Sequence, residues 1–75
     1  MASDIATLSR REQEVLLLVA ADMTDREIAR ALGIAERTVR AHVSRIILKL
    51  GVASRVGAAV AVTKWLVGSG RQPAV

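Results

Sequence analysis

The side chains with the most specific chemistry lie in residues 35 to 50, which read AERTVRAHVSRIILKL. Arg37 and Arg40 can each donate two parallel hydrogen bonds to O6 and N7 of a guanine, or clamp a phosphate. Ala41 permits close approach and can contact a thymine methyl group, and Ser44 can donate or accept a hydrogen bond. Together these residue types indicate the reading of base edges in the major groove of DNA.

The spacing of this segment fits a helix with two different sides. At ~100° per residue, one stripe is apolar and consists of Val39, Val43, Ile46 and Leu50. The opposite side carries Arg37, Arg40, Ala41, Ser44 and Leu48. A flank between the two is suited to the sugar-phosphate backbone and carries Thr38, Arg45 and Lys49. The alternative is a solvated helix face, and the absence of acidic residues from 37 to 49 counts against it.

Thr24 and His42 are further candidates for contact with DNA. Thr24 stands at the start of a short helix, whose backbone amides form an anion site, so we expect a phosphate contact there. His42 lies beside the apolar stripe and either packs against a neighbouring helix or contacts a phosphate.

An enzyme, a metal site and a bound cofactor are not expected from this composition. The chain has no Cys and a single His, so it cannot form a disulfide or a cluster of metal ligands. There is no Gly-rich phosphate loop and no carboxylate pair beside a plausible cleft. Glu12 and Glu14 lie at a capped helix start, where a structural role explains them.

Length and charge narrow the class of protein. The 75 residues suffice for one small domain, and the core must be built almost wholly from Leu, Ile, Val and Ala because Phe and Tyr are missing. A net charge of +4 favours an acidic partner such as nucleic acid. The longest apolar run, residues 15–21, is far short of the ~20 residues of a membrane span, so we expect a cytoplasmic protein without membrane contact.

Local signals predict an all-α domain with helices at about 9–22, 24–32, 35–50 and 54–67. Ser9 and Thr24 each open a capping box, and Ser54 caps the last helix. Gly33 and Gly51 supply helix ends, whereas Ala35 offers no side-chain cap. We therefore expect one domain over residues 8–67. Residues 1–7 are expected to be a flexible tail or a linker remnant, and residues 68–75 a flexible tail.

The second and third predicted helices have the spacing of a helix-turn-helix. A short helix, a turn of three or four residues containing Gly33 and a longer helix define that geometry. Ala29 keeps the inner side of the short helix small, while Ile34 and Val39 can fill the corner. The predicted architecture is a four-helix bundle that contains this motif.

The last predicted helix has two apolar sides. One stripe holds Val56, Val60 and Val67, and nearly opposite lies a second stripe of Ala58, Val62 and Trp65. Because a helix on a small core needs only one apolar side, we predict a two-fold dimer through this helix. The predicted interface residues are Val56, Ala59, Val60, Thr63 and Val67, although the sequence leaves open which stripe faces the partner. The alternative is that its Ala residues are simply good helix formers.

The sequence resembles the LuxR/FixJ-type, or GerE-like, helix-turn-helix domain, the output module of many bacterial response regulators and quorum-sensing receptors. The match covers residues 8 to about 62 and rests on REQEVL, EIA, LGI, TVR, a His and KLGV in that order. The resemblance implies a dimer on DNA, with the third helix in the major groove and the fourth at the dimer contact. By position it implies base contacts by Arg37, Arg40, Ala41 and Ser44, and phosphate contacts by Thr24, Thr38, Arg45 and Lys49.

Several positions depart from the pattern of that family. The family usually has Ser at Ala35, Gly or Asn at Asp22, and Lys at Arg40. It favours Glu or Gln at Gly57. Leu17 and Leu48 stand where polar residues are common.

The expected function is sequence-specific binding of duplex DNA for transcription regulation, at inverted-repeat half-sites and as a homodimer. RNA polymerase is a candidate further partner. The alternative is a protein-interaction or dimerisation module that binds nucleic acid only incidentally. Whether the chain stands alone or is the effector domain of a longer regulator is left open by the sequence.

Overall fold

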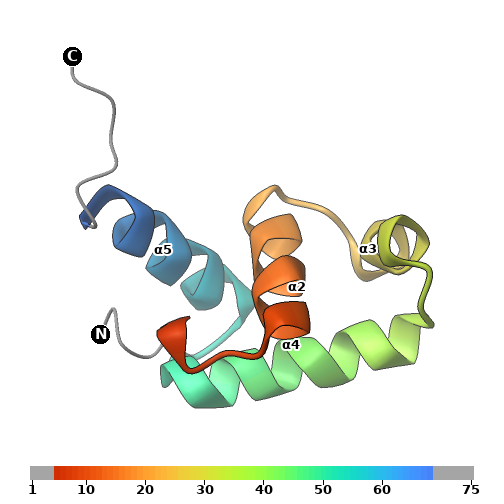
Figure 1. Ribbon diagram of the computed structural model, residues 1–75, viewed down its shortest axis with the longest axis horizontal. Helices are drawn as coiled ribbons and strands as arrows, with labels where there is room; N and C mark the ends of the chain where they lie inside the picture. The colour runs from red at the N-terminus through yellow and green to blue at the C-terminus, as the bar shows by residue number, and fades with distance from the viewer. Residues whose placement is uncertain (1–4, 69–75) are drawn as a thin grey trace.

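The computed structural model describes residues 5–68, and all of its regular structure is helical. The helices are α2 (Arg10–Ala20), α3 (Asp25–Leu32), α4 (Glu36–Leu50) and α5 (Arg55–Leu66) (Figure 1). The predicted all-α fold with a helix-turn-helix is confirmed, because a short α3 is followed by a tight turn and the long α4. The predicted tail at 68–75 lies outside the described residues except for Gly68.

Both predicted capping boxes are present. At the start of α2, the Glu12 amide donates to Ser9 Oγ at 3.1 Å, and the Ser9 amide donates to Glu12 Oε1 at 2.9 Å. At the start of α3, the Glu27 amide donates to Thr24 Oγ1 at 3.1 Å, and the Thr24 amide donates to Glu27 Oε1 at 2.8 Å. Each box satisfies two backbone donors that helix geometry leaves unpaired, so both helix starts are fixed locally.

The helix ends differ in how they reverse the chain. Gly33 and Gly51 end α3 and α4 in the left-handed region, with φ of 69° and 65°. The first predicted helix was expected to continue to residue 22, but α2 ends at Ala20 and Asp22 itself adopts a φ of 65°. Asp is one of the residues that tolerate this conformation, so Asp22 here serves as a helix stop without a glycine.

The core lies where α2, α4 and α5 meet and continues under α3. All four helices contribute buried apolar side chains, among them Leu16, Ile28, Val39 and Val62. The stripe predicted for α4 is the one that faces inward, with Val39, Val43, Ile46 and Leu50 all buried. Ala29 is buried on the inner side of α3, as the helix-turn-helix packing requires.

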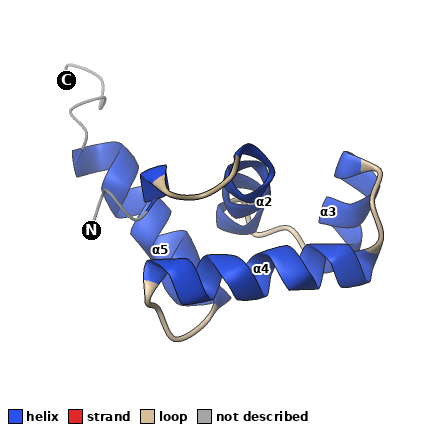
Figure 2. Ribbon diagram, turned by 60° about the horizontal axis from the view of Figure 1, so that its bottom comes forward, coloured by secondary structure: helices blue, strands red, loops and turns tan. Residues whose placement is uncertain are grey.

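The arrangement leaves one long side of α4 uncovered. α2 and α3 lie on the same side of α4, and α5 packs at its C-terminal end and against α2 (Figure 1, Figure 2). The opposite side of α4 has no element packed on it within residues 5–68 (Figure 2). The fold therefore leaves one side of α4 exposed along the edge of the domain, while the other side packs in the core.

The domain begins earlier than the predicted boundary at residue 8. Ile5 and Leu8 are each about 5% exposed and belong to the core, and the Leu8 amide donates to the Ile5 carbonyl at 3.1 Å. The predicted tail therefore does not extend over the whole of 1–7, because Ile5 is packed; residues 1–4 lie outside the described part.

No single helix within residues 5–68 has the length and composition to cross a bilayer, and α4 and α5 meet both criteria only together, across a 61° bend.

Candidate nucleic-acid interface

The uncovered side of α4 gathers all four predicted base-contacting residues. Their side chains are all exposed. Arg37, Ala41 and Ser44 lie opposite the buried stripe of the same helix, and Arg40 lies at the edge of the exposed side. Three of them continue into Leu48 with spacings of four, three and four residues, which places them on one line along the helix. We call this line, Arg37, Ala41, Ser44 and Leu48, the outward stripe; Arg40 lies beside it.

Arg40 keeps its guanidinium accessible. Its Nη1 lies 3.9 Å from Glu36 Oε1, one turn earlier, and both side chains are about half exposed. An exposed pair at this distance contributes little free energy, so Arg40 can exchange it for a nucleic acid contact. Glu36 also occupies the first turn of α4, whose N-cap residue Ala35 makes no side-chain hydrogen bond.

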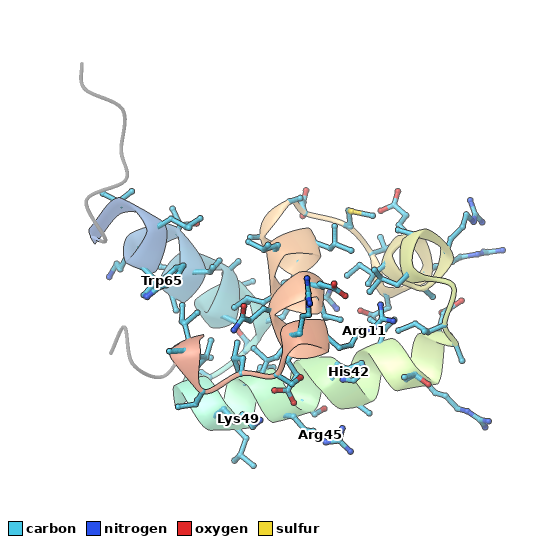
Figure 3. The ribbon with its side chains drawn as sticks, viewed as in Figure 1. Arg11, His42, Arg45, Lys49 and Trp65 are labelled. Carbon is cyan, nitrogen blue, oxygen red and sulfur yellow. The ribbon has the colours of Figure 1, made fainter. Side chains whose placement is uncertain are left out.

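Thr38, Arg45 and Lys49 share one flank of α4, but their surroundings differ. Thr38 is half-buried, whereas Arg45 is exposed and extends from the side of α4 that faces away from α2 (Figure 3). Lys49 is not a free cation, because its Nζ donates to Glu12 Oε1 at 2.8 Å. Lys49 therefore has a structural partner that the sequence prediction of a phosphate contact did not include.

Glu12 is the buried charged residue that holds this contact. It is 4% exposed, and its Oε1 accepts from the Ser9 amide as well as from Lys49. The Lys49 ammonium, and after it the Ser9 amide, hold the pKa of the Glu12 carboxyl below its ordinary value near 4.5, although burial acts in the opposite direction. Sequence reasoning identified Glu12 as part of a capping box, but no local signal pointed to a partner 37 positions away.

Thr24 is exposed, but its groups are already used for capping. Its amide donates to Glu27, and its Oγ1 accepts from the Glu27 amide. Asp25 and Glu27 also place two carboxylates in the first turn of α3. The Glu27 carboxylate thus occupies the Thr24 amide, and Asp25 adds a second negative charge at the helix start predicted as an anion site. The hydroxyl proton is the group that Thr24 can still donate.

Arg55 joins α5 to the start of the helix-turn-helix. Its guanidinium pairs with the Asp25 carboxylate and donates to the Met23 carbonyl at 3.2 Å. This contact was missed at the sequence level, because 30 positions separate Arg55 from Asp25. It fixes α3 relative to α5 and so helps to hold α4, which packs against both.

His42 lies on the part of α4 that faces α2 (Figure 3). It is half-buried, and its Nδ1 is buried without a hydrogen-bond partner within the described residues. A ring nitrogen enclosed in this way cannot reach a phosphate. Of the two interpretations, the geometry of Nδ1 supports packing between helices.

The packing of α5 shows which of its two predicted apolar stripes faces the core. Ala58 and Val62 are buried, and Trp65 packs against the core from the end of the molecule away from α3 (Figure 3). The other predicted stripe points outward, and Val56, Val60 and Val67 are all exposed. Of the remaining predicted interface residues, Ala59 is half-buried, and Thr63 is exposed and donates its hydroxyl proton to the Ala59 carbonyl at 2.9 Å. α5 therefore carries an apolar surface that its own domain does not cover.

The amino-acid sequence was compared with those of known protein families and proteins, and the similarities agree with the helix-turn-helix described above. The sequence model of the family described as "Bacterial regulatory proteins, luxR family" matches residues 6–62. The chain is 54% identical over 50 residues to the transcriptional regulatory protein TdiR of Thauera aromatica, covering 67% of this chain and 22% of TdiR. It is 49% identical over 53 residues to the spore germination protein GerE of Bacillus subtilis, covering 71% of this chain and 72% of GerE.

A third relative is the nitrate/nitrite response regulator protein NarL of Escherichia coli K12, which is 42% identical over 57 residues, covering 76% of this chain and 26% of NarL. The chain thus spans about a quarter of the length of TdiR and NarL but most of GerE. Because the family match covers more than half of the chain and includes the whole helix-turn-helix, the chain belongs to the luxR family of bacterial regulatory proteins.

Proposed function

We propose that this domain regulates transcription by binding specific sequences of duplex DNA, with α4 in the major groove and a second copy paired through α5. The observation that carries the proposal is the composition of the uncovered side of α4. It presents two arginines, an alanine and a serine on a helix whose other side is anchored in the core. A rigid helix with such a face matches the width and the donor and acceptor pattern of the major groove.

The residues divide into two kinds of contact. Arg37, Arg40, Ala41 and Ser44 are proposed to contact base edges. Thr38 and Arg45 lie on the flank and are proposed to contact phosphates, as is the Thr24 hydroxyl at the start of α3. Lys49 is retained as a phosphate contact of mixed role, because 41% of its side chain is exposed while its ammonium is bonded to Glu12.

The proposed dimer is supported by the outward-facing apolar residues of α5. Val56, Val60 and Val67 are exposed, and burying them against the same residues of a second copy removes apolar surface from water. In such a pair, a two-fold axis relates the two α4 helices, as it relates the two half-sites of an inverted repeat. We expect the target sites to be inverted repeats with half-site centres about 10 bp apart, one turn of the duplex.

The lengths of the relatives support a proposal for the place of the domain within a regulator. TdiR and NarL are much longer than this chain, whereas GerE is of similar length. We propose the role of an output domain of the response-regulator type, with RNA polymerase as a candidate partner at promoters. The activity of any longer protein is part of this proposal.

Salt titration of DNA binding tests the proposal against an interaction module that binds nucleic acid incidentally. Several neutralised phosphates require log affinity to fall steeply with log salt concentration. A site selected from random duplexes should bind at least ~10³-fold more tightly than unrelated DNA at the same salt. A steep salt dependence without any preference among sequences would favour the interaction module instead.

A further inference from the structure

Leu48 is the most exposed large apolar side chain within residues 5–68, at 81% exposed. It contributes almost nothing to the core, so the fold gives no reason for an apolar residue there. A single exposed leucine is ordinary on a protein surface and carries no inference by itself. The inference depends instead on the position of Leu48 on α4, in line with the candidate base-contacting residues.

Leu48 is the last member of the outward stripe. The buried stripe of α4 is Val39, Val43, Ile46 and Leu50, with spacings of four, three and four residues. The outward stripe repeats that spacing two positions earlier, which is a rotation of about 200° around the helix. The core therefore fixes the direction of Leu48 as firmly as that of Arg37, Ala41 and Ser44, and a groove that receives the stripe faces Leu48 too.

The outward stripe is long enough to extend along several base pairs of a duplex. Eleven residues separate Arg37 from Leu48, which is about 16 Å along a helix and roughly five base steps at ~3.4 Å each. Leu48 can neither donate nor accept a hydrogen bond. The one apolar group that a base presents in the major groove is the 5-methyl group of thymine.

The neighbours of Leu48 favour close approach to DNA at this turn. Arg45 is exposed on the adjoining flank and keeps the local charge positive (Figure 3). The bond between Lys49 and Glu12 ties the same turn of α4 to the first turn of α2, so this turn keeps its orientation within the domain. We propose that Leu48 is a specificity-determining residue that selects thymine through its 5-methyl group, at the end of each half-site opposite to the base read by Arg37.

This inference rests on the proposed function, and deoxyuridine scanning tests it separately. Each thymine of a selected site is replaced in turn by deoxyuridine, which removes only the methyl group, in both half-sites of the repeat. For the wild-type chain, we expect affinity to fall about fourfold per half-site at the thymine that faces Leu48, the effect of one buried methyl group. For Leu48→Ala, the thymine and deoxyuridine duplexes should bind equally at that position. A methyl effect at a thymine that faces Ala41 would be the same in the wild type and in Leu48→Ala.

Leu17→Ala is the matched control, because Leu17 is also an exposed leucine but lies on α2. It should retain the wild-type response to deoxyuridine. Wild-type binding that is specific but insensitive to every deoxyuridine, or a Leu48→Ala variant that keeps every methyl effect of the wild type, would overturn the role of Leu48 and leave the proposed function intact. Loss of sequence preference in the wild-type chain itself would overturn both.

Discussion

At the scale of single residues, Arg40 and Arg45 carry the same charge on α4 but point in different directions. Arg40 lies beside the outward stripe with a weak exposed pair to Glu36, and Arg45 lies on the flank. Removing a base contact changes sequence preference, whereas removing a phosphate contact weakens binding to every duplex. Under the proposed function, we therefore expect Arg40 to contribute to the choice of base pair and Arg45 to contribute to phosphate binding.

We expect Arg40→Ala to cost roughly 1 to 3 kcal/mol on a selected site and to relax the preference at one base pair of each half-site. Competition binding against a panel of single base-pair variants measures this effect. Arg30→Ala, which removes an exposed arginine from α3, is the matched control and should keep the wild-type preference. An unchanged preference profile in Arg40→Ala would exclude it as a base contact.

Arg45→Ala should weaken all duplexes alike. Because one phosphate contact is lost, the slope of log affinity against log salt should flatten by about one unit. Titrations at several salt concentrations with a selected and a random duplex give both quantities. A change confined to the selected duplex would assign Arg45 to the bases instead.

Lys49 and Glu12 connect stability to pH. Glu12 is buried and its folded-state pKa lies below its ordinary value near 4.5, so its contribution to the free energy of unfolding is present above that value and is lost as pH falls through the folded-state pKa. We expect wild-type stability to decline from about pH 4.5 downward, and Glu12→Gln to show a weaker decline. Urea denaturation at pH 7 and over pH 5 to 3 measures both; identical pH profiles would contradict the assignment.

Lys49→Ala should lower the free energy of unfolding by about 1 to 3 kcal/mol at neutral pH, because it leaves a buried carboxylate without its strongest partner. Arg45→Ala removes the same charge from an exposed neighbour and should leave stability nearly unchanged. Loss of DNA binding in Lys49→Ala is therefore interpretable only alongside its urea midpoint. Equal stability of the two variants would show that the ion pair contributes nothing.

At the scale of elements, α4 is the least well capped of the helices that the structure describes. Ser9, Thr24 and Ser54 each accept from a backbone amide, but Ala35 cannot, although its φ of −75° and ψ of 151° are those of an ordinary N-cap. Ala35→Ser should raise the free energy of unfolding by about 1 kcal/mol. Thermal unfolding compares it with Ala53→Ser in the loop before α5; equal gains would point to a non-specific effect.

The elements were predictable because their signals are local. The two capping boxes predicted the starts of α2 and α3, and two glycines predicted the ends of α3 and α4. The period of apolar residues in α4 identified its buried stripe. Ile5 was missed because a single apolar residue in a polar stretch has no period. The Glu12–Lys49 and Arg55–Asp25 contacts were missed because only the folded chain brings residues 37 and 30 positions apart together.

At the scale of the whole molecule, pairing through α5 should determine how DNA is occupied. We expect Val60→Asp to retain binding to a single half-site but to lose cooperative occupancy of an inverted repeat, because an aspartate cannot be buried in an apolar interface without cost. Leu17→Asp is the matched control, since Leu17 and Val60 are 50% and 48% exposed. Gel-shift titration on single and paired half-sites distinguishes them; cooperative binding by Val60→Asp would place the interface elsewhere.

The sequence predicts the directions of the candidate interface residues on α4 but not the orientation of α5. The direction of Arg37, Arg40, Ala41 and Ser44 followed from helical period, and all four are exposed as expected. The orientation of α5 could not be decided, because both of its stripes are apolar and only packing against α2 and α4 selects Ala58 and Val62 as the inner one.

The central claim is that the outward stripe of α4 and the neighbouring Arg40 face base edges while the buried stripe anchors the helix. A crystal structure of the chain with a selected inverted repeat tests it most directly. We predict α4 in the major groove of each half-site, with the Arg40 guanidinium within hydrogen-bonding distance of guanine O6 and N7. A complex in which these arginines fold back onto their own chain, while another surface holds the duplex, would contradict the account.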